Sequence, residues 1–331
     1  MNTIALDAMG GDHMPAAAVK GALRAAKEGI PIMLVGQKDA LKKELEQHGA
    51  LDTSPQICEA NDVIGMNEHA TDVRKRKDSS IMQAMKLVKE GQAAACVSMG
   101  HSGATMAAAL MVLGRIKGVE RPAILANIPT EHGYAALIDA GANADCRASY
   151  LQQFALMGSI YAKAFYAQES PKVGLMSIGE EESKGNELVK EAHLLLKETP
   201  GINFYGNVEG RDLLKGLTDV VVTDGFTGNV VLKLAEGEAK TLFGWIRDAL
   251  TQNGPLVKLG AALVRPALKS LADRMDPSEY GAQPLLGVNG YAFIGHGSAD
   301  DRAVYNALKT AKRSIEAKLN DKIAKGLGAL S

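Results

Sequence analysis

Six short segments combine glycine with residues that carry charge or form hydrogen bonds, and each follows a short apolar run. Glycine lets the backbone approach a ligand closely. The free N–H groups and positive dipole of a helix that begins there favour an anion. Together the six segments predict a site for an anionic, phosphate-like ligand. They are DAMGGD (7–12), GHSGAT (100–105), DAGAN (139–143), IGEEESKGN (178–186), DGFTGN (224–229) and HGSAD (296–300).

The motifs of several other chemistries are missing from the chain. No G-x-G-x-x-G follows the first apolar run, and no G-x-x-x-x-G-K-[ST] occurs, so neither a dinucleotide fingerprint nor a P-loop is present. GHSGAT departs from the nucleophile elbow G-x-S-x-G because residue 104 is alanine. No H-E-x-x-H and no carboxylate cluster indicates a catalytic metal. We therefore expect neither a metal nor a cofactor.

The segments must be positioned by strands and helices. Short apolar runs alternate with stretches of helical period, which predicts a Rossmann-like α/β fold with a mostly parallel sheet flanked by helices. In such a sheet all six turns should emerge at the carboxyl edge, where open α/β folds bind ligands. We expect strands at 3–9, 31–36, 56–60, 94–99, 123–128, 135–140, 173–178, 203–206, 219–223 and 291–295, and helices that include 15–29, 79–91, 103–116, 149–166 and 186–199.

The chain has no low-complexity linker, internal repeat or shift in composition, so we expect one domain over residues 1–331. Residues 237–280 carry helical signal without a strand and predict a helical excursion that projects from the sheet. Pro266 is expected to kink or restart the helix there. Leu256, Leu259, Leu263, Leu268, Leu271 and Met275 should lie near one face, and Lys258, Arg265 and Lys269 on another.

Composition narrows the class of protein. The 37 basic and 38 acidic residues leave a net charge of −1, which provides no general field for nucleic acid. The three cysteines show no metal-like spacing and are expected to be small buried residues. The N-terminus is no signal peptide, and no window approaches the roughly 18 apolar residues of a spanning helix. We expect a cytoplasmic protein with at most peripheral membrane contact.

Five of the six segments, all except GHSGAT, occur together with RPA at 121–123 in the order in which the bacterial phosphate acyltransferase family carries them, and the chain resembles that family over nearly its whole length. The resemblance implies transfer of a long-chain acyl group from acyl carrier protein (ACP) to inorganic phosphate. The acyl phosphate would then serve a membrane-embedded glycerol-3-phosphate acyltransferase of phospholipid synthesis. The resemblance also implies a homodimer and a fold similar to phosphotransacetylases and isocitrate or isopropylmalate dehydrogenases.

That reaction needs little from the protein besides positioning and charge stabilisation. Phosphate is itself a nucleophile, and a thiol pKa of about 8.5 makes the thiolate a fair leaving group. We expect Lys184 to neutralise phosphate or the oxyanion and Asn229 to donate a hydrogen bond to one of them. The other expected substrate contacts are Gly10, Gly11, Asp12, His13, His101, Ser102, Gly103, Asn186, Gly225, Thr227, Gly228, His296 and Ser298.

Several of these residues have structural alternatives. Lys184 could be a solvated loop lysine, and Asn229 could cap a helix. The histidines could serve as structural hydrogen-bonding groups. Asp12 and Asp139 could cap helices or orient Lys184 and backbone donors, since a carboxylate repels phosphate. His101 stands where the family usually has asparagine, which leaves its role open.

Two basic features suggest surfaces for partners. The surface formed by Lys258, Leu259, Leu263, Arg265 and Lys269 is expected to contact ACP, a membrane or a second copy of the chain. The run 74–77, Arg-Lys-Arg-Lys, is either solvated surface or a docking point for the acidic ACP. Two rival functions stay open: an NAD-dependent dehydrogenase of the isopropylmalate type, and an inactive scaffold that binds ACP or membrane.

Overall fold

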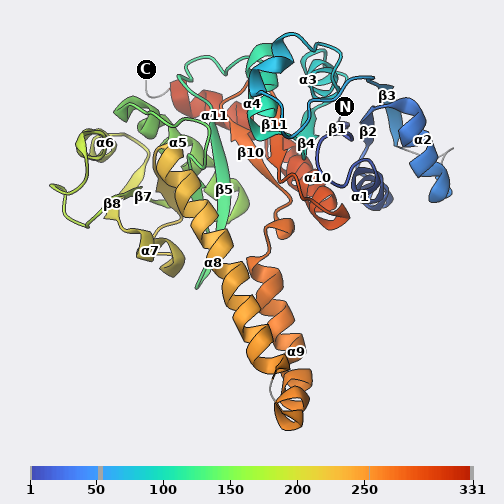
Figure 1. Cartoon of the computed structure of the whole chain (residues 1–331). Coiled ribbons are helices and arrows are strands. Elements are labelled where there is room, and N and C mark those ends of the chain that lie inside the picture. Colours follow the sequence, from blue (N-terminus) through green and yellow to red (C-terminus); the bar gives the residue numbers. More distant parts are fainter. Residues whose placement is uncertain (1, 51–54, 253, 329–331) are drawn as a thin grey trace.

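The computed structural model describes residues 2–50, 55–252 and 254–328, and within these ranges one 11-stranded sheet runs through the molecule with helices on both faces (Figure 1). The strand order is β3-β2-β1-β4-β11-β10-β5-β6-β9-β7-β8. The strands are β1 (Ile4–Asp7), β2 (Ile32–Gly36), β3 (Gln56–Glu59), β4 (Ala95–Ser98), β5 (Ala123–Thr130), β6 (Gly133–Ile138), β7 (Lys172–Met176), β8 (Asn203–Val208), β9 (Val220–Val222), β10 (Ala282–Leu286) and β11 (Tyr291–Gly295).

The α-helices alternate with these strands along most of the chain, as the hydrophobic periodicity predicts. All five predicted helical stretches and all ten predicted strands coincide with elements of the structure. The α-helices are α1 (Ala16–Lys27), α2 (Lys38–Gln47), α3 (Ser80–Lys89), α4 (Ser102–Val112), α5 (Ala148–Phe165), α6 (Glu187–Lys197), α7 (Gly210–Lys215), α8 (Gly225–Thr251), α9 (Pro255–Met275), α10 (Asp301–Glu316) and α11 (Leu319–Gly328).

The sheet consists of two parallel halves that run in opposite directions. Strands β1 to β4 and β11 are parallel to one another, and β6 to β9 form a second parallel group. Between the halves lie three antiparallel pairings: β11 with β10, β10 with β5, and β5 with β6. Because three antiparallel pairings separate the halves, the strands of the second half run opposite to those of the first. The prediction of a mostly parallel sheet is confirmed, but the prediction that all six turns share one edge is wrong.

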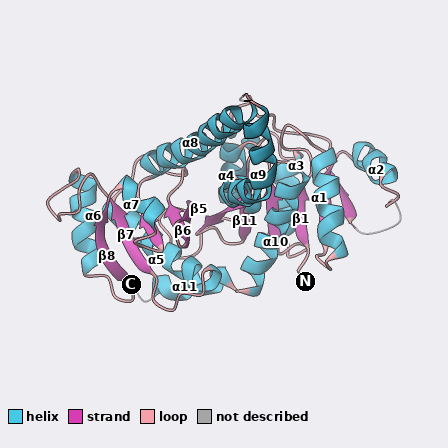
Figure 2. Ribbon diagram, turned by 90° about the horizontal axis from the view of Figure 1, so that it is seen from below, coloured by secondary structure: helices cyan, strands magenta, loops and turns pink. Residues whose placement is uncertain are grey.

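Three apolar cores hold the helices against the sheet. One core covers a whole face of the sheet and includes side chains of α3, α4 and the first turns of α8. On the opposite face, α1 and α10 pack on one half and α5 and α11 on the other. Figure 2 shows this division, with α3, α4 and α8 on one side and α5, α10 and α11 on the other. Helices α4 and α8 therefore share a face of the sheet.

The predicted excursion is an arm formed by α8 and α9, which pack as an antiparallel pair and project from the body (Figure 1). Residue 253, in the connection between them, lies outside the described residues. Pro266 is inside one continuous α9, so the helix does not restart there. Leu256, Leu259 and Leu263 are 84%, 62% and 77% exposed, whereas Leu268 and Met275 are half-buried. Part of the expected apolar face therefore packs on α8, and the rest is exposed to solvent.

No helix within the described residues has the length and apolar character needed to cross a membrane.

Candidate functional site

Three of the six glycine turns meet at one edge of the sheet, after the neighbouring strands β1, β4 and β11. A Cβ atom at Gly10 would lie 2.8 Å from the Cα atom of Gly100, so the first two turns touch through their backbones. The Asp12 N–H donates to the carbonyl oxygen of Gly297 at 2.7 Å, and this hydrogen bond joins the first turn to the third. We call this group, residues 7–13, 98–105 and 296–300, the β4 cluster.

A buried aspartate lies at the base of the β4 cluster. Asp7, the last residue of β1, is 2% exposed, and its Oδ2 accepts a hydrogen bond from Ser98 Oγ at 2.7 Å. Ser98 Oγ in turn accepts from the Gly100 N–H at 3.1 Å. Burial raises the pKa of Asp7, and hydrogen bonds from hydroxyl and N–H groups partly oppose that rise. The Asp7–Ser98 pair fixes the ends of two adjacent strands.

Backbone N–H groups at the start of α4 and in the adjoining turn after β1 donate no hydrogen bond within the described residues. The N–H groups of Gly11, Ser102 and Gly103 have no hydrogen-bond partner within the described part of the chain. All three residues are at least partly exposed, and residues 102–105 include no acidic side chain. Gly11 has φ of +113°, where a side chain would be strained. An anion at this point would meet N–H groups and the positive end of a helix dipole.

His101 is the N-cap of α4. Its Nδ1 accepts a hydrogen bond from the Ala104 N–H at 3.2 Å, which places the ring proton of the neutral form on Nε2. Asparagine is a strong N-cap residue because its side-chain oxygen accepts the same bond. The departure from the family pattern at His101 therefore preserves the capping acceptor.

The third turn of the β4 cluster is less suited to an anion. His296 Nδ1 lies 2.8 Å from Ser298 Oγ and accepts from the Ser298 N–H at 3.3 Å. Asp300 caps α10 by accepting from the Ala303 N–H, and Asp301 follows in the first helical turn. These carboxylates repel an anion at that helix start. The side chains of Asp12 and His13 are exposed at the rim of the cluster.

A second group of turns, at the opposite edge, follows β6 and β9, and we call residues 138–143 and 223–229 the β9 cluster. Asp139 is its buried centre, at 0% exposure. Burial raises the pKa of Asp139, and the N–H groups around it oppose the rise. Its Oδ1 accepts from the N–H groups of Ile124, Gly141 and Ala142 at 2.9–3.1 Å, and its Oδ2 accepts from Asn143 N and Nδ2 at 2.7 and 2.8 Å.

The start of α8 packs closely against the turn that contains Asp139. The Gly225 N–H donates to the carbonyl oxygen of Asn143 at 2.7 Å. Asp224 is the N-cap, since it accepts from both the N–H and the hydroxyl of Thr227 at 2.8 Å. A Cβ atom at Gly228 would lie 1.9 Å from the Asp139 carbonyl oxygen, so only glycine permits this contact. The chain itself uses most N–H groups of the β9 cluster.

Asn229 lies in the second turn of α8 and does not cap it. Its side chain is exposed beside Gly141, whose added Cβ atom would lie 3.6 Å from it. Within the described residues the side chain has no hydrogen-bond partner. The alternative role as a helix cap is therefore wrong, because Asp224 has that role.

Lys184 lies on the turn after β7, where its side chain is exposed and rests against Gly179. Asn186 caps α6 by accepting from the Val189 N–H at 2.9 Å. Between described residues, no hydrogen bond or ion pair joins Lys184 to Asn229 or to the β4 cluster. Beside this turn is a hollow of about 220 Å³ whose lining includes Glu180 and Asp212, carboxylates that disfavour an anion.

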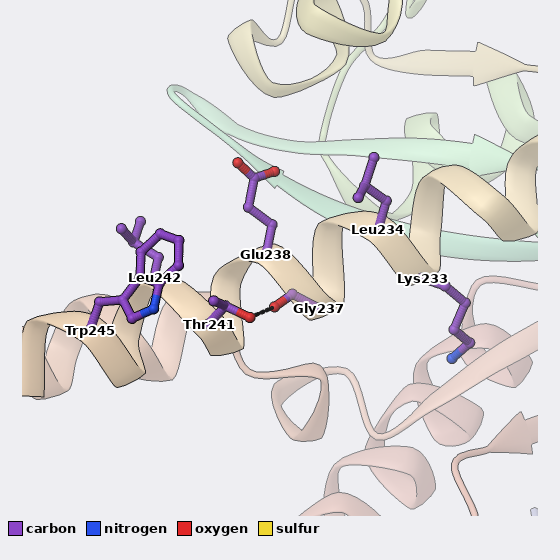
Figure 3. A pocket seen from close by; sticks show the side chains of 7 residues that line it. All are labelled: Lys233, Leu234, Gly237, Glu238, Thr241, Leu242 and Trp245. Atoms are coloured by element: carbon purple, nitrogen blue, oxygen red, sulfur yellow. Dashed lines mark hydrogen bonds between the residues drawn. The ribbon is translucent and has the colours of Figure 1, made fainter. Parts of the chain in front are cut away.

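A larger hollow, of about 630 Å³, lies along the exposed side of α8 (Figure 3). All its lining residues belong to this one helix, so it is an open surface and not an enclosed cavity. Leu234 and Trp245 within it are 67% and 68% exposed. The lining residues are Lys233, Leu234, Gly237, Glu238, Thr241, Leu242 and Trp245.

Solved structures of other proteins share the fold. A phosphotransacetylase from Streptococcus pyogenes has a TM-score of 0.63 at 19% identity, covering 95% of this chain and 94% of that one. A branched-chain phosphotransacylase from Enterococcus faecalis has a TM-score of 0.58 at 15% identity, covering 95% and 99%. A putative 4-hydroxythreonine-4-phosphate dehydrogenase from Salmonella typhimurium has a TM-score of 0.54 at 13% identity, with the same coverage. At these identities the likeness concerns the fold alone.

Sequence relatives are much closer. The model of the family described as "Fatty acid synthesis protein" matches residues 2–322. A phosphate acyltransferase from Thermus thermophilus is 57% identical over 327 residues, covering 99% of each chain. Proteins of the same name from Deinococcus radiodurans and Desulfitobacterium hafniense are 56% and 51% identical, covering 83% and 98% of this chain and 77% and 97% of theirs. The chain belongs to the phosphate acyltransferase family and is an acyltransferase of fatty acid and phospholipid synthesis.

Proposed function

We propose that the protein transfers a long-chain fatty acyl group from acyl-ACP to inorganic phosphate, and that the acyl phosphate serves phosphatidic acid synthesis. The observation that carries this proposal is the set of unused N–H groups of Ser102 and Gly103, at the start of α4, and of Gly11, in the adjoining turn after β1. They suit a phosphate ion, and the family membership of the chain supports the acyl transfer. A membrane-embedded glycerol-3-phosphate acyltransferase would consume the product.

In the proposed reaction a phosphate oxygen attacks the thioester carbonyl carbon. The new C–O bond forms, the C–S bond breaks, and the sulfur leaves as a thiolate that takes a proton from water. The protein holds phosphate at the β4 cluster and lowers the barrier by fixing its position and by stabilising negative charge. Because phosphate is the nucleophile, no serine or cysteine nucleophile is required.

Lys184 and Asn229 are the proposed catalytic side chains at the β9 edge. Both are exposed and have no partner within the described chain. Their proposed role is to stabilise negative charge that develops on the acyl carbonyl oxygen, whereas phosphate is held by the N–H groups of the β4 cluster. Alanine at either position should therefore lower kcat by about 10²–10³ and leave the KM for phosphate close to that of the parent.

The proposal is tested by trapping acyl phosphate with hydroxylamine after mixing the protein with palmitoyl-ACP and phosphate. The expected result is acyl hydroxamate that forms only when both substrates are present. Acyl-CoA and acetyl donors run in parallel define the donor. Hydroxamate from acetyl donors alone would overturn the long-chain assignment, and none from any donor would overturn the activity.

The arm formed by α8 and α9 is proposed to pair with a second copy and to bring the dimer to the membrane surface from the cytoplasm. None of residues 255–275 is fully buried, and Leu256, Leu259 and Leu263 are mostly exposed, whereas the apolar face of a helix is usually covered. The exposed Leu259 and Leu263 lie on the same helix as the exposed Lys258, Arg265 and Lys269, which suits an anionic lipid surface.

Flotation with anionic liposomes tests the membrane contact. Leu259→Glu should reduce flotation relative to the parent, while gel filtration reports the oligomeric state. Unchanged flotation by a Leu259→Glu dimer would remove the membrane role, and a monomeric parent would remove the dimer.

A further inference from the structure

Residues 61–79 form a closed loop, which we call the strap. Its ends meet, because Asp62 and Ser79 form a parallel bridge and the Ser80 N–H donates to the Asp62 carbonyl oxygen at 2.8 Å. A short 3-10 helix, η1 (Ala70–Arg74), lies within it and packs on α4. The strap thus borders the helix whose start carries the unused N–H groups.

Arg76 holds the strap in shape. Its guanidinium donates to Glu68 at 2.6 Å, to Asp62 Oδ2 at 2.8 Å and to the carbonyl oxygen of Val63 at 2.6 Å. Glu68 also accepts from the Gly65 N–H at 2.6 Å. These hydrogen bonds raise the pKa of Arg76 and lower the pKa values of Asp62 and Glu68. Among the four consecutive basic residues at 74–77, Arg76 is therefore the one whose side chain is bound within the strap.

The inner side of the strap rests on the β4 cluster. A Cβ atom at Gly297 would lie 2.6 Å from Met66 Cε, and one at Gly103 would lie 3.0 Å from Ala70 Cβ. Val73, a residue of η1, is fully buried. A protein bound to the strap would therefore sit beside the proposed phosphate site.

The outer side of the strap presents unpaired cations. Arg74, Lys75 and Lys77 are exposed, and their side chains have no hydrogen bond or ion pair within the described chain. The acidic residues of the strap are mostly engaged: Asp62 and Glu68 bind Arg76, and Asp72 accepts from the backbone of the 3-10 helix. Asp78 is the exposed acid beside them, and it accepts from Gln83.

We propose that the outer face of the strap, through Arg74, Lys75 and Lys77, is the docking surface for the acidic carrier protein that delivers the acyl thioester. This inference rests on the proposed function, since it names the carrier of that reaction's donor. Complementary charge raises the association rate and orients the partner. Docking here places the carrier against the residues that cover the β4 cluster.

The test compares two donors that carry the same thioester: palmitoyl-ACP, and S-palmitoyl pantetheine, which is neutral and has no protein. The variant Arg74→Glu/Lys75→Glu/Lys77→Glu reverses the charge of the strap, and Lys38→Glu/Lys42→Glu/Lys43→Glu makes the same change of charge at exposed residues of α2 that have no part in a proposed site. We expect the strap variant to lose about tenfold or more in kcat/KM for palmitoyl-ACP. Its kcat/KM for the pantetheine donor should stay at the parent value, and the α2 variant should match the parent with both donors.

Salt gives a second readout, because added salt should lower kcat/KM of the parent for palmitoyl-ACP and have much less effect on the strap variant. Equal losses by the strap variant on both donors, unchanged use of palmitoyl-ACP, or an equal loss in the α2 variant would each overturn the docking assignment. If the parent uses both donors and the strap variant uses them equally well, the docking role of the strap is refuted and the proposed function is not. A parent that forms acyl phosphate from neither donor would refute the proposed function itself.

Discussion

The β4 and β9 clusters are built from the same parts and end with different properties. Each has a buried aspartate at or just after a strand end, glycine turns packed backbone to backbone, and a helix that starts in the cluster. In the β4 cluster, Asp7 is held by a side-chain hydroxyl, and N–H groups at the start of α4 are left over. In the β9 cluster, Asp139 takes five N–H bonds from the backbone and side chain around it.

This difference separates a binding turn from a structural one. A glycine-rich turn is open to an anion only where its N–H groups are not already bound within the protein. By that criterion the β4 cluster is suited to phosphate, whereas the β9 cluster is a rigid base that positions Asn229. Substitutions at the two aspartates should therefore have different consequences.

The largest effect is expected from Asp139→Ala. It leaves five donors without their acceptor, one of them buried and four partly buried, and each buried donor left unpaired costs about 1–3 kcal/mol. We expect a loss of unfolding free energy on the order of 4 kcal/mol or more, measured by urea denaturation. Asp139→Asn should lose less because it keeps one acceptor oxygen. If Asp139→Ala unfolded within about 1 kcal/mol of the parent, the β9 cluster would not depend on its aspartate.

A smaller and pH-dependent effect is expected at Asp7. Because burial raises its pKa in the folded state, the folded protein retains a proton that the unfolded chain releases. This contribution is complete below the unfolded pKa of about 3.9 and is lost as pH rises through the folded pKa. A tenfold difference in proton affinity between the folded and unfolded states corresponds to about 1.4 kcal/mol of unfolding free energy.

Asp7→Asn removes this titration. Urea unfolding between pH 4 and 8 should show the stability of Asp7→Asn improving relative to the parent as pH rises, and then levelling off. A constant difference, or one of opposite sign, would show that Asp7 is not the titrating group. Asp12→Asn, the same change at an exposed position of the same cluster, is the matched control.

The smallest effect on global stability is expected from Arg76→Ala, because its ion pairs are partly exposed to solvent, which screens them. Its local effect should be clear: amide exchange across residues 61–79 should become roughly tenfold faster, with no change at 139–143. Lys75→Ala, at the exposed neighbour whose side chain has no partner within the described residues, should leave the exchange as it is in the parent. Equal exchange in Arg76→Ala and parent would mean that Arg76 does not hold the strap.

Local pattern was enough to predict most elements of the fold. Apolar runs bounded by glycine located ten strands, and helical periodicity located the arm. Strand β10 was not predicted, because its five residues, AQPLL, are few and contain Pro284. Periodicity also says nothing about which strands become neighbours. The reversal of the second half of the sheet, and with it the division of the six turns, therefore required the structure.

The state of each turn depends on contacts distant in sequence. Asp7 and Ser98 are 91 residues apart, and no local pattern joins them. Some signals were present nonetheless: Asp224 followed three residues later by Thr227 is a capping pattern that could have excluded Asn229 as the cap. Among the four basic residues at 74–77, the sequence did not distinguish Arg76, whose partners Asp62 and Glu68 come 14 and 8 residues earlier.

The claim that the start of α4 binds phosphate can be tested with proline. Ser102 is the first residue of α4 and follows an extended residue, a position that accepts proline. Ser102→Pro removes one unused N–H group and keeps the helix, whereas Ser102→Ala keeps the N–H group and removes the hydroxyl. Glu187→Pro makes the same change at the first residue of α6, which also follows an extended residue.

The decisive quantity is kcat/KM for phosphate in these three variants. We predict a loss of about 10² in Ser102→Pro, with Ser102→Ala and Glu187→Pro close to the parent. Parent-like use of phosphate by a folded Ser102→Pro protein, or an equal loss in Glu187→Pro, would contradict the assignment of phosphate to the β4 cluster.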